Sequence, residues 1–137
     1  MKYLLISFIA FTAFVSCEDK NEYDINADNN YKQSKSNIEK TELKNPTHFL
    51  FATAKKRKNF IRQTVISGYI YNNAKVVTYK DAEILLSFYS KTGTLLEEDR
   101  QTIYEKIVPG GTVNFKTKYF TPTGTDSMSV KVVAAKF

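Results

Sequence analysis

The residues of this chain whose side chains could act in catalysis are few and far apart. The 137 residues include one histidine, His48, and one cysteine, Cys17. Nucleophilic catalysis by serine or cysteine needs a positioned base, and His48 lies at the edge of a polar segment. The adjacent acids at 97–99 alternate across an extended chain, so they do not face each other as a glycosidase pair does. The sequence therefore predicts no catalytic residues.

A metal or cofactor site is not expected either. Residues 24–30 carry oxygen-bearing side chains at alternate positions, like the start of an EF-hand loop. That loop needs glycine at its sixth place and glutamate at its twelfth, and these places hold Asn29 and Lys35. A zinc site needs three or four clustered ligands, and the sequence contains no such cluster. We therefore expect no metal and no cofactor.

Binding is better supported, because the chain contains one dense basic run. Lys55, Lys56, Arg57 and Lys58 are consecutive, and Arg62 is close behind. They form a candidate site for an anionic partner, such as lipopolysaccharide phosphates or an acidic glycan. The alternative is the solvated tip of a hairpin. Nucleic acid is not an expected partner, because aromatic side chains are not interleaved with the charges.

Tyrosine provides a second candidate surface. Tyrosine is enriched at interfaces because its ring offers a large contact area at low entropic cost. Alternatively, these are ordinary strand residues with a buried ring and an exposed hydroxyl. The tyrosines concerned are Tyr69, Tyr71, Tyr79, Tyr89, Tyr104 and Tyr119.

The N-terminus has the features of an export signal. Lys2 precedes an apolar or small-residue run at 3–15, shorter than the ~20 residues that span a bilayer as a helix. Phe14-Val15-Ser16-Cys17 resembles a bacterial lipoprotein signal, which is removed before a cysteine that then carries the lipid. The resemblance implies a signal peptide at 1–16 and lipidation of Cys17. The alternative is a plain secretory signal with an incidental cysteine.

Charge is distributed unevenly after Cys17. Residues 18–28 contain five acids and one lysine, and this resembles the signal that exports some Gram-negative lipoproteins to the cell surface. The alternative is that an acidic, polar segment simply keeps a tether disordered. Residues 49–137 carry 14 Lys or Arg against 7 Asp or Glu. We therefore expect a protein anchored by lipid to the outer membrane, exposed at the cell surface or facing the periplasm.

Residues 17–48 are expected to form the lipidated cysteine and a flexible polar linker. Their few apolar residues follow no helical or strand period, and a short helix at 36–44 would be polar all round and marginal. As a coil, the 31 residues at 18–48 would span roughly 30 Å. That exceeds the ~8 Å screening length at physiological salt, so the basic domain need not touch the membrane.

Beyond residue 48 the chain has the pattern of short strands. Apolar residues recur at every second position in Ala82, Ile84, Leu86 and Phe88, as in a strand with one buried face. Gly68 indicates a bulge or a close approach of two backbones. Further strands are expected at 49–52, 60–71, 76–78, 95–108 and 112–120, and in a closing strand where Met128, Val130, Val132 and Ala134 alternate.

These strands and the turns between them predict the fold class. Gly93 and Pro109-Gly110-Gly111 provide turns, and no long helical pattern interrupts the strands. The sequence therefore predicts an all-β fold at 49–137, an antiparallel immunoglobulin-like β-sandwich of about seven strands. A signal peptide and a disordered tether precede it.

Residues 63–133 resemble an FxLYD-type domain, a small β-sandwich of bacterial secreted proteins and lipoproteins. The name-giving motif is partly kept, since Leu86-Ser87-Phe88-Tyr89-Ser90 stands where Phe-x-Leu-Tyr-Asp is expected. The resemblance implies an accessory or binding module without catalytic residues. The matching residues are Val65, Gly68, Asn72, Ile84, Phe88, Tyr89, Gly93, Pro109, Gly110 and Phe115.

Together these patterns predict a lipid-anchored, non-enzymatic interaction module displayed outside the cytoplasm. Its expected partners are the membrane, through Cys17, and a protein or an anionic envelope polymer. The alternative is a structural or accessory subunit of an outer-membrane complex. Such a subunit would dock through an exposed sheet edge or a tyrosine-rich face.

Overall fold

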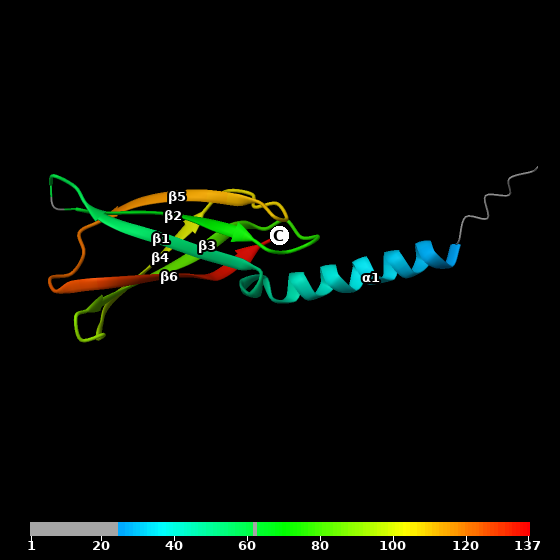
Figure 1. Ribbon diagram of the computed structural model, residues 1–137, viewed down its shortest axis with the longest axis horizontal. Coiled ribbons are helices and arrows are strands. Elements are labelled where there is room, and N and C mark those ends of the chain that lie inside the picture. Colours follow the sequence, from blue (N-terminus) through cyan, green and yellow to red (C-terminus); the bar gives the residue numbers. More distant parts are fainter. Residues whose placement is uncertain (1–24, 62) are drawn as a thin grey trace, which may run out of the picture.

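The computed structural model describes residues 25–61 and 63–137, which form a β domain with a helix projecting from one end (Figure 1). The helix is α1 (Ile25–Lys44), followed by a short 3-10 helix, η1 (Pro46–His48). The strands are β1 (Leu50–Lys58), β2 (Thr64–Asn72), β3 (Lys80–Ser90), β4 (Leu95–Ile103), β5 (Thr112–Tyr119) and β6 (Thr125–Lys136). The signal peptide expected at 1–16 and the lipidated Cys17 lie outside the described residues.

The strands form two antiparallel sheets of three strands each. The first sheet has the order β1-β2-β5 and the second the order β4-β3-β6. Apolar side chains from both sheets, among them Ile66, Ile70 and Leu86, share one buried core. The prediction of an all-β, antiparallel, sandwich-like domain is therefore confirmed.

The expected number of about seven strands is wrong, because the described residues form six. The segment at 76–78, expected as a short edge strand, forms none, and beside it a single isolated bridge pairs Tyr79 with Ile107. The backbone at 75–77 instead donates its N–H groups to a side chain of α1. Because these N–H groups are already bonded to α1, they cannot pair with a neighbouring strand.

Strand β3 confirms the two-residue period. Ala82, Ile84, Leu86 and Phe88 are all buried in the core. Leu85, between them, is buried as well. A middle strand is flanked on both edges, here by β4 and β6, so its outward side chains are partly covered by those of its neighbours.

Strand β6 departs from the expected alternation near its end. Met128, Val130 and Val132 pack toward the core, but Ala134 is exposed and Ala135 packs inward instead. The register between β3 and β6 shifts here, from Ile84 opposite Val132 to Glu83 opposite Ala134. One extra residue in β6 at this point moves the following side chains to the opposite face.

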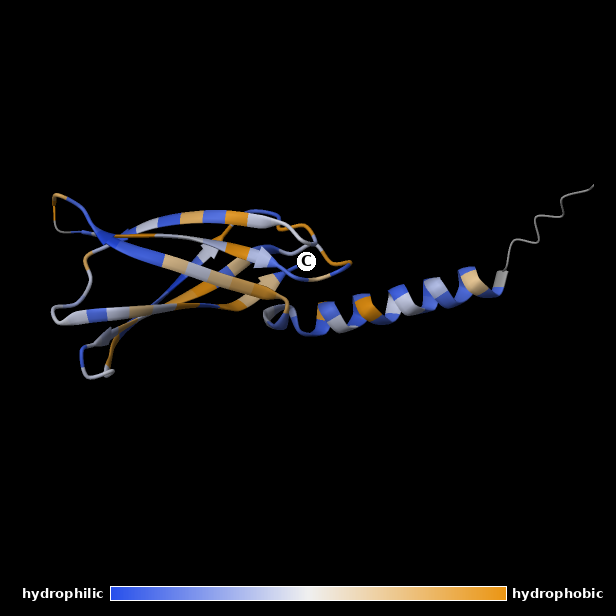
Figure 2. Cartoon of the chain, in the orientation of Figure 1, coloured by the Kyte–Doolittle hydropathy of each residue, from blue (hydrophilic) through white to orange (hydrophobic). Residues whose placement is uncertain are grey.

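Strand β1 is longer than expected and contains the basic run. Its pairing with β2 continues to Lys58 opposite Thr64, and β1 changes from apolar to hydrophilic along its length (Figure 2). The turn follows Lys58, because the Asn59 side chain accepts the backbone N–H groups of Ile61 (3.1 Å) and Gln63 (2.9 Å). Lys55–Lys58 are therefore exposed at the end of the β1–β2 hairpin, as the alternative expected, but they lie in the strand and not in the turn.

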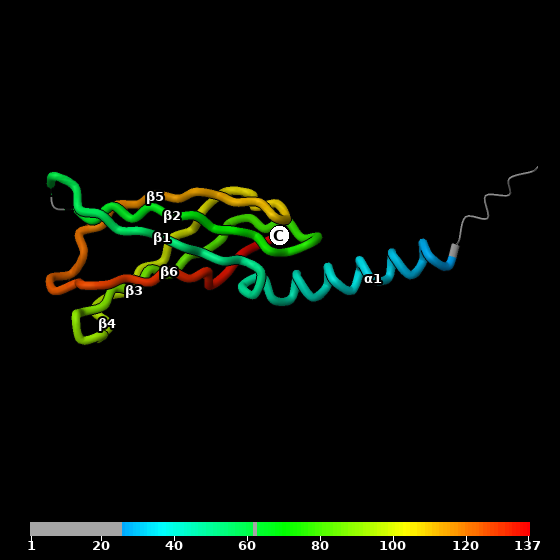
Figure 3. Tube along the Cα trace, in the orientation of Figure 1, coloured from blue at the N-terminus to red at the C-terminus, as the bar shows by residue number. Residues whose placement is uncertain are grey.

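Helix α1 occupies the described part of the segment expected to be a flexible linker. Its 20 residues correspond to a rod of about 30 Å, and the trace leads from it through η1 directly into β1 (Figure 3). An ion pair of 2.6 Å joins Lys32 to Asp28 one turn earlier. The expectation of a coil is wrong for residues 25–44, and contacts described below attach the end of this helix to the β domain.

Gly68 is the point where the first sheet has least room for a side chain. The register of β2 is unbroken on both sides, so the glycine does not mark a bulge. A Cβ added there would lie 2.0 Å from the carbonyl oxygen of Thr53 and 2.8 Å from Cζ of Phe115. The alternative prediction, a close approach, is confirmed.

Replacing Gly68 with alanine should destabilise the domain by about 1–3 kcal/mol, because the added methyl group meets backbone that cannot move without disturbing the sheet. Urea unfolding followed by circular dichroism measures this as a lower midpoint. The exposed neighbour Ser67→Ala serves as control and should change stability by no more than about 0.5 kcal/mol. An unchanged midpoint for Gly68→Ala would contradict the close approach.

Candidate functional site

The outer face of the first sheet brings together side chains from three strands. Leu50, Ile66 and Val113 point into the core, so their neighbours in each strand point outward. The register places the outward residues in four rows across the sheet. We call these twelve residues the aromatic–basic face: Phe51, Tyr71 and Thr112; Thr53, Tyr69 and Asn114; Lys55, Ser67 and Lys116; Arg57, Val65 and Lys118.

The half of this face nearer to η1 is aromatic. Phe51 is 53% and Tyr69 is 46% exposed, while Tyr71 is half-buried. With Thr53 and Thr112 they line a shallow pocket of about 480 Å³. Aromatic rings in an open pocket bordered by hydroxyl groups can stack against a flat ligand and hydrogen-bond to its edge.

The other half of the face is basic. Lys55 and Arg57 of β1 and Lys116 and Lys118 of β5 are all exposed. The twelve residues of the face include no Asp or Glu, and these four cations form no ion pair within the part of the chain that the structure describes. Two columns of cations stand on either side of β2, roughly 10 Å apart. Such a surface attracts anions.

Val65 lies between the two columns and is only 3% exposed, although it belongs to the outer face. Its register partners are Arg57 on one side and Lys118 on the other. Long basic side chains cover apolar surface with their stems while their charged ends stay in water. Arg57 and Lys118 therefore cover the apolar side chain between them, whereas Ser67, between Lys55 and Lys116, is exposed.

The basic run of the sequence is divided between the two faces of β1. Lys55 and Arg57 belong to the aromatic–basic face, whereas Lys56 and Lys58 alternate to the other side. There the ammonium of Lys56 donates to the backbone carbonyl of Asp126. Lys56 and Lys58 also line a small cavity of about 140 Å³ near Thr64. Arg62, the fifth residue of the predicted site, lies outside the described residues.

Sequence reasoning missed Lys116 and Lys118. The sequence does show that Lys116 and Lys118 share one face of their strand, because they alternate with the apolar Val113 and Phe115. The alternation does not show which strand lies beside them. Only the pairing of β5 with β2 places these lysines beside Lys55 and Arg57.

The tyrosines do not assemble into one surface. Tyr69 and Tyr71 lie on the aromatic–basic face, Tyr79 is fully buried and Tyr104 is 80% exposed in a loop. Tyr119 donates its hydroxyl to Asp99 of β4 and so links the two sheets. Burial, with the hydrogen bond to Asp99 second, raises the pKa of Tyr119 to about 12.

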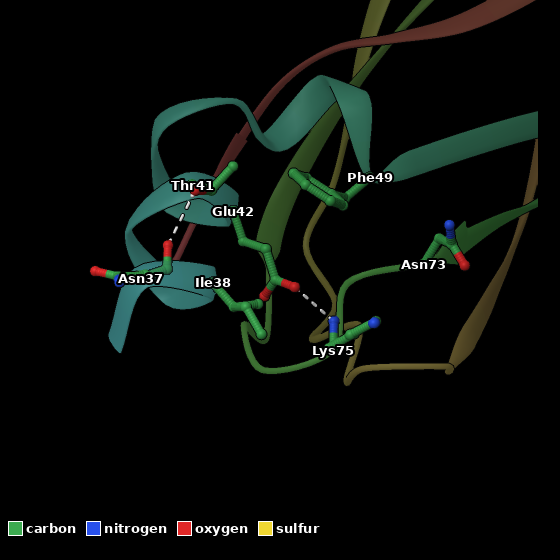
Figure 4. A pocket seen from close by; sticks show the side chains of 7 residues that line it. All are labelled: Asn37, Ile38, Thr41, Glu42, Phe49, Asn73 and Lys75. Atoms are coloured by element: carbon green, nitrogen blue, oxygen red, sulfur yellow. Dashed lines mark hydrogen bonds between the residues drawn. The ribbon is translucent and has the colours of Figure 1, made fainter. Parts of the chain in front are cut away.

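The end of α1 is fixed to the β domain by the buried side chain of Glu42 (Figure 4). Its carboxylate accepts the backbone N–H groups of Lys75 (2.7 Å), Val76 (3.0 Å) and Val77 (2.9 Å). The hydroxyl of Tyr79 donates to the Glu42 carbonyl oxygen over 2.9 Å. Burial, and after it the charge of Glu42, raises the pKa of Tyr79 to about 12.

The loop that receives Glu42 is itself held by Asn72, at the end of β2. The Asn72 amide group donates to the carbonyl oxygens of Val77 (3.0 Å) and Ile107 (2.8 Å), and its oxygen accepts the N–H of Ala74 (2.8 Å). Asn72 is fully buried. Helix α1 therefore packs against a loop whose shape is set from inside the domain.

A hollow of about 390 Å³ lies beside this attachment (Figure 4). Its lining includes Thr41 and Glu42, whose side chains already have partners within the chain. The Glu42 carboxylate is taken by the loop amides, and the Thr41 hydroxyl donates to the carbonyl of Asn37. A ligand site needs free, convergent polar groups. We therefore assign this hollow to helix packing and take the aromatic–basic face as the candidate site.

Comparisons with known proteins give no match: no family model, no curated protein and no solved structure matches the chain. Among residues 25–61 and 63–137, no three side chains that could hold a metal ion are grouped. The same residues contain no helix that is long and apolar enough to cross a membrane.

Replacing Glu42 with glutamine should loosen the attachment of α1. A glutamine keeps one acceptor oxygen but presents an NH₂ group to the remaining loop N–H donors. The expected loss is about 1–3 kcal/mol, confined to the junction. Hydrogen exchange should therefore accelerate at the amides of 75–77, and the pKa of Tyr79 should fall below about 12.

The matched control is Glu39→Gln, which removes the same charge from an exposed position of α1. It should leave the exchange at 75–77 and the ultraviolet titration of tyrosine unchanged. If Glu42→Gln and Glu39→Gln behave alike, the carboxylate of Glu42 does not hold the helix.

Proposed function

We propose that this protein is a lipid-anchored, non-enzymatic interaction module of the cell envelope, which binds an anionic partner through the aromatic–basic face. The observation that carries the proposal is a set of four exposed cations, Lys55, Arg57, Lys116 and Lys118, on one flat face without a carboxylate. Like charges held together at a surface cost free energy, and an anionic partner removes that cost.

The anchor is proposed from the sequence. The lipoprotein-like signal ending at Cys17 would fix the N-terminus to a membrane, and the acidic residues after it favour the outer surface of the outer membrane over the periplasmic side. Helix α1 supports such a display, because a rod of about 30 Å exceeds the ~8 Å screening length at physiological salt. The cations are then available to a partner other than the anchoring membrane.

We also propose that the β domain is an immunoglobulin-like sandwich of the FxLYD type. Its support is that residues of the resembling motif interact across the sequence. Gly68 lies opposite Phe115 in the register of β2 and β5, and the N–H of Gly110 donates to the carbonyl of Asn72 over 2.8 Å. Modules of this kind serve as accessory or binding domains, which agrees with a non-enzymatic role.

A structural subunit that docks through a sheet edge is the second candidate. Its support is that four strands, β1, β4, β5 and β6, each pair on one side only in the described residues. However, all four carry charged side chains: Lys55–Lys58 in β1, the acids at 97–99 in β4, Lys116 and Lys118 in β5, and Lys131 in β6. Charged side chains on edge strands oppose strand addition, so we favour the anionic partner.

Replacing Cys17 with alanine should release the protein from the membrane fraction and abolish labelling by a palmitate analogue, because no residue then carries the lipid. The wild-type chain is the reference, and protease added to intact cells distinguishes surface display from a periplasmic position. A Cys17→Ala chain that stays in the membrane fraction would contradict the lipid anchor.

The binding proposal predicts that Lys55→Gln, Arg57→Gln, Lys116→Gln and Lys118→Gln, combined in one variant, weaken retention on immobilised dextran sulfate. Exposed ion pairs contribute about 0.2–1 kcal/mol each, so losing four should weaken binding by about fourfold or more. The control is Lys91→Gln with Lys131→Gln, two exposed lysines away from this face. Equal retention of the fourfold variant and wild type would exclude this face as the binding site.

A further inference from the structure

We infer that the partner of the aromatic–basic face is a linear polysaccharide that contains both acidic and neutral sugars. This inference rests on the proposed function and adds the chemical class of the anion. Its basis is that one continuous face offers stacking surface in one half and positive charge in the other. A polymer with uncharged rings and with carboxylates satisfies both halves at once.

The central strand of the sheet sets the path of such a chain. Along β2 the outward residues are Val65, Ser67, Tyr69 and Tyr71, which span roughly 20 Å. Cations flank the first two, and Phe51 lies opposite Tyr71. A chain lying along β2 passes from the cations that surround Ser67 and cover Val65 onto the aromatic pocket.

The uncharged polar residues of the face favour a sugar over a simple polyanion. Thr53, Ser67, Thr112 and Asn114 are exposed between and beside the tyrosines. Their hydroxyl and amide groups both donate and accept hydrogen bonds, which suits the hydroxyl groups of a sugar. A partner bound by charge alone makes no use of them.

The same layout argues against nucleic acid and against a lipid surface. Single-stranded nucleic acid is bound by stacking platforms along a basic groove, whereas here the rings and the cations occupy separate halves of the face. Membrane binding by aromatic side chains depends on their insertion at the lipid boundary. Here hydroxyl and amide groups border the rings of Tyr69 and Tyr71, and inserting this face into lipid would bury those polar groups.

The test compares polymers that separate charge from rings, using the full chain. Hyaluronan oligosaccharides have alternating acidic and neutral sugars, poly-L-glutamate has the charge without the rings, and dextran has the rings without the charge. Calorimetry at one salt concentration should give hyaluronan at least about tenfold higher affinity than poly-L-glutamate of equal charge, because only hyaluronan covers the exposed aromatic rings. Dextran should bind more weakly than hyaluronan.

The aromatic half is tested with Tyr69→Ser and Tyr71→Ser in one variant. It should weaken hyaluronan binding about tenfold or more and leave poly-L-glutamate binding unchanged, and an unchanged circular dichroism spectrum shows that the variant is folded. Tyr104→Ser, at an exposed loop position away from the face, is the control and should bind as wild type does.

The outcomes separate this inference from the function on which it rests. Equal affinity for hyaluronan and poly-L-glutamate, with no effect of the tyrosine variant, would overturn the polysaccharide and leave the anionic partner. Tighter binding of oligothymidylate, or of phosphatidylglycerol vesicles, would overturn it in favour of that class. If the fourfold charge variant binds hyaluronan as wild type does, both the inference and the proposed function fail.

Discussion

The buried carboxylate of Glu42 is the interaction on which the position of α1 relative to the β domain depends. A carboxylate that is 1% exposed is unfavourable unless its oxygens are hydrogen-bonded, and the amides of 75–77 provide three bonds. A helix with so polar a surface is marginal alone. Its fixed position therefore comes from this contact and from Asn72, which shapes the receiving loop.

The first sheet contributes to the core with one face and to the candidate site with the other, because side chains alternate between the two faces along each strand. On its inner face, Gly68 leaves room for Phe115 and the core is closely packed. On its outer face, the residues beside Gly68, Ser67 and Tyr69, belong to a surface of cations and aromatic rings. Binding chemistry can thus occupy one face without disturbing the packing of the other, since the two sets of side chains point in opposite directions.

The fold could be anticipated where its determinants are local. The alternation in β3 and the glycine turns depend on residues near one another in sequence, and both are found in the structure. Two local interpretations failed for physical reasons. A turn was expected at Lys55–Lys58 because charged residues interrupt the apolar pattern there, but the turn is formed by Asn59, just after them. A coil was expected in place of α1 because the amphipathic period of this segment is weak.

The sequence by itself determined the class of the β domain, since a period of two residues and the turn residues specify strands directly. It also indicated an export signal and a net positive domain. Tertiary structure alone decided the candidate site. Lys116 and Lys55 lie on the same face only because β1 and β5 both pair with β2 at Ser67. Glu42 binds a loop that lies more than 30 residues further along the chain. Contacts of that separation depend on how strands pair, which no local pattern encodes.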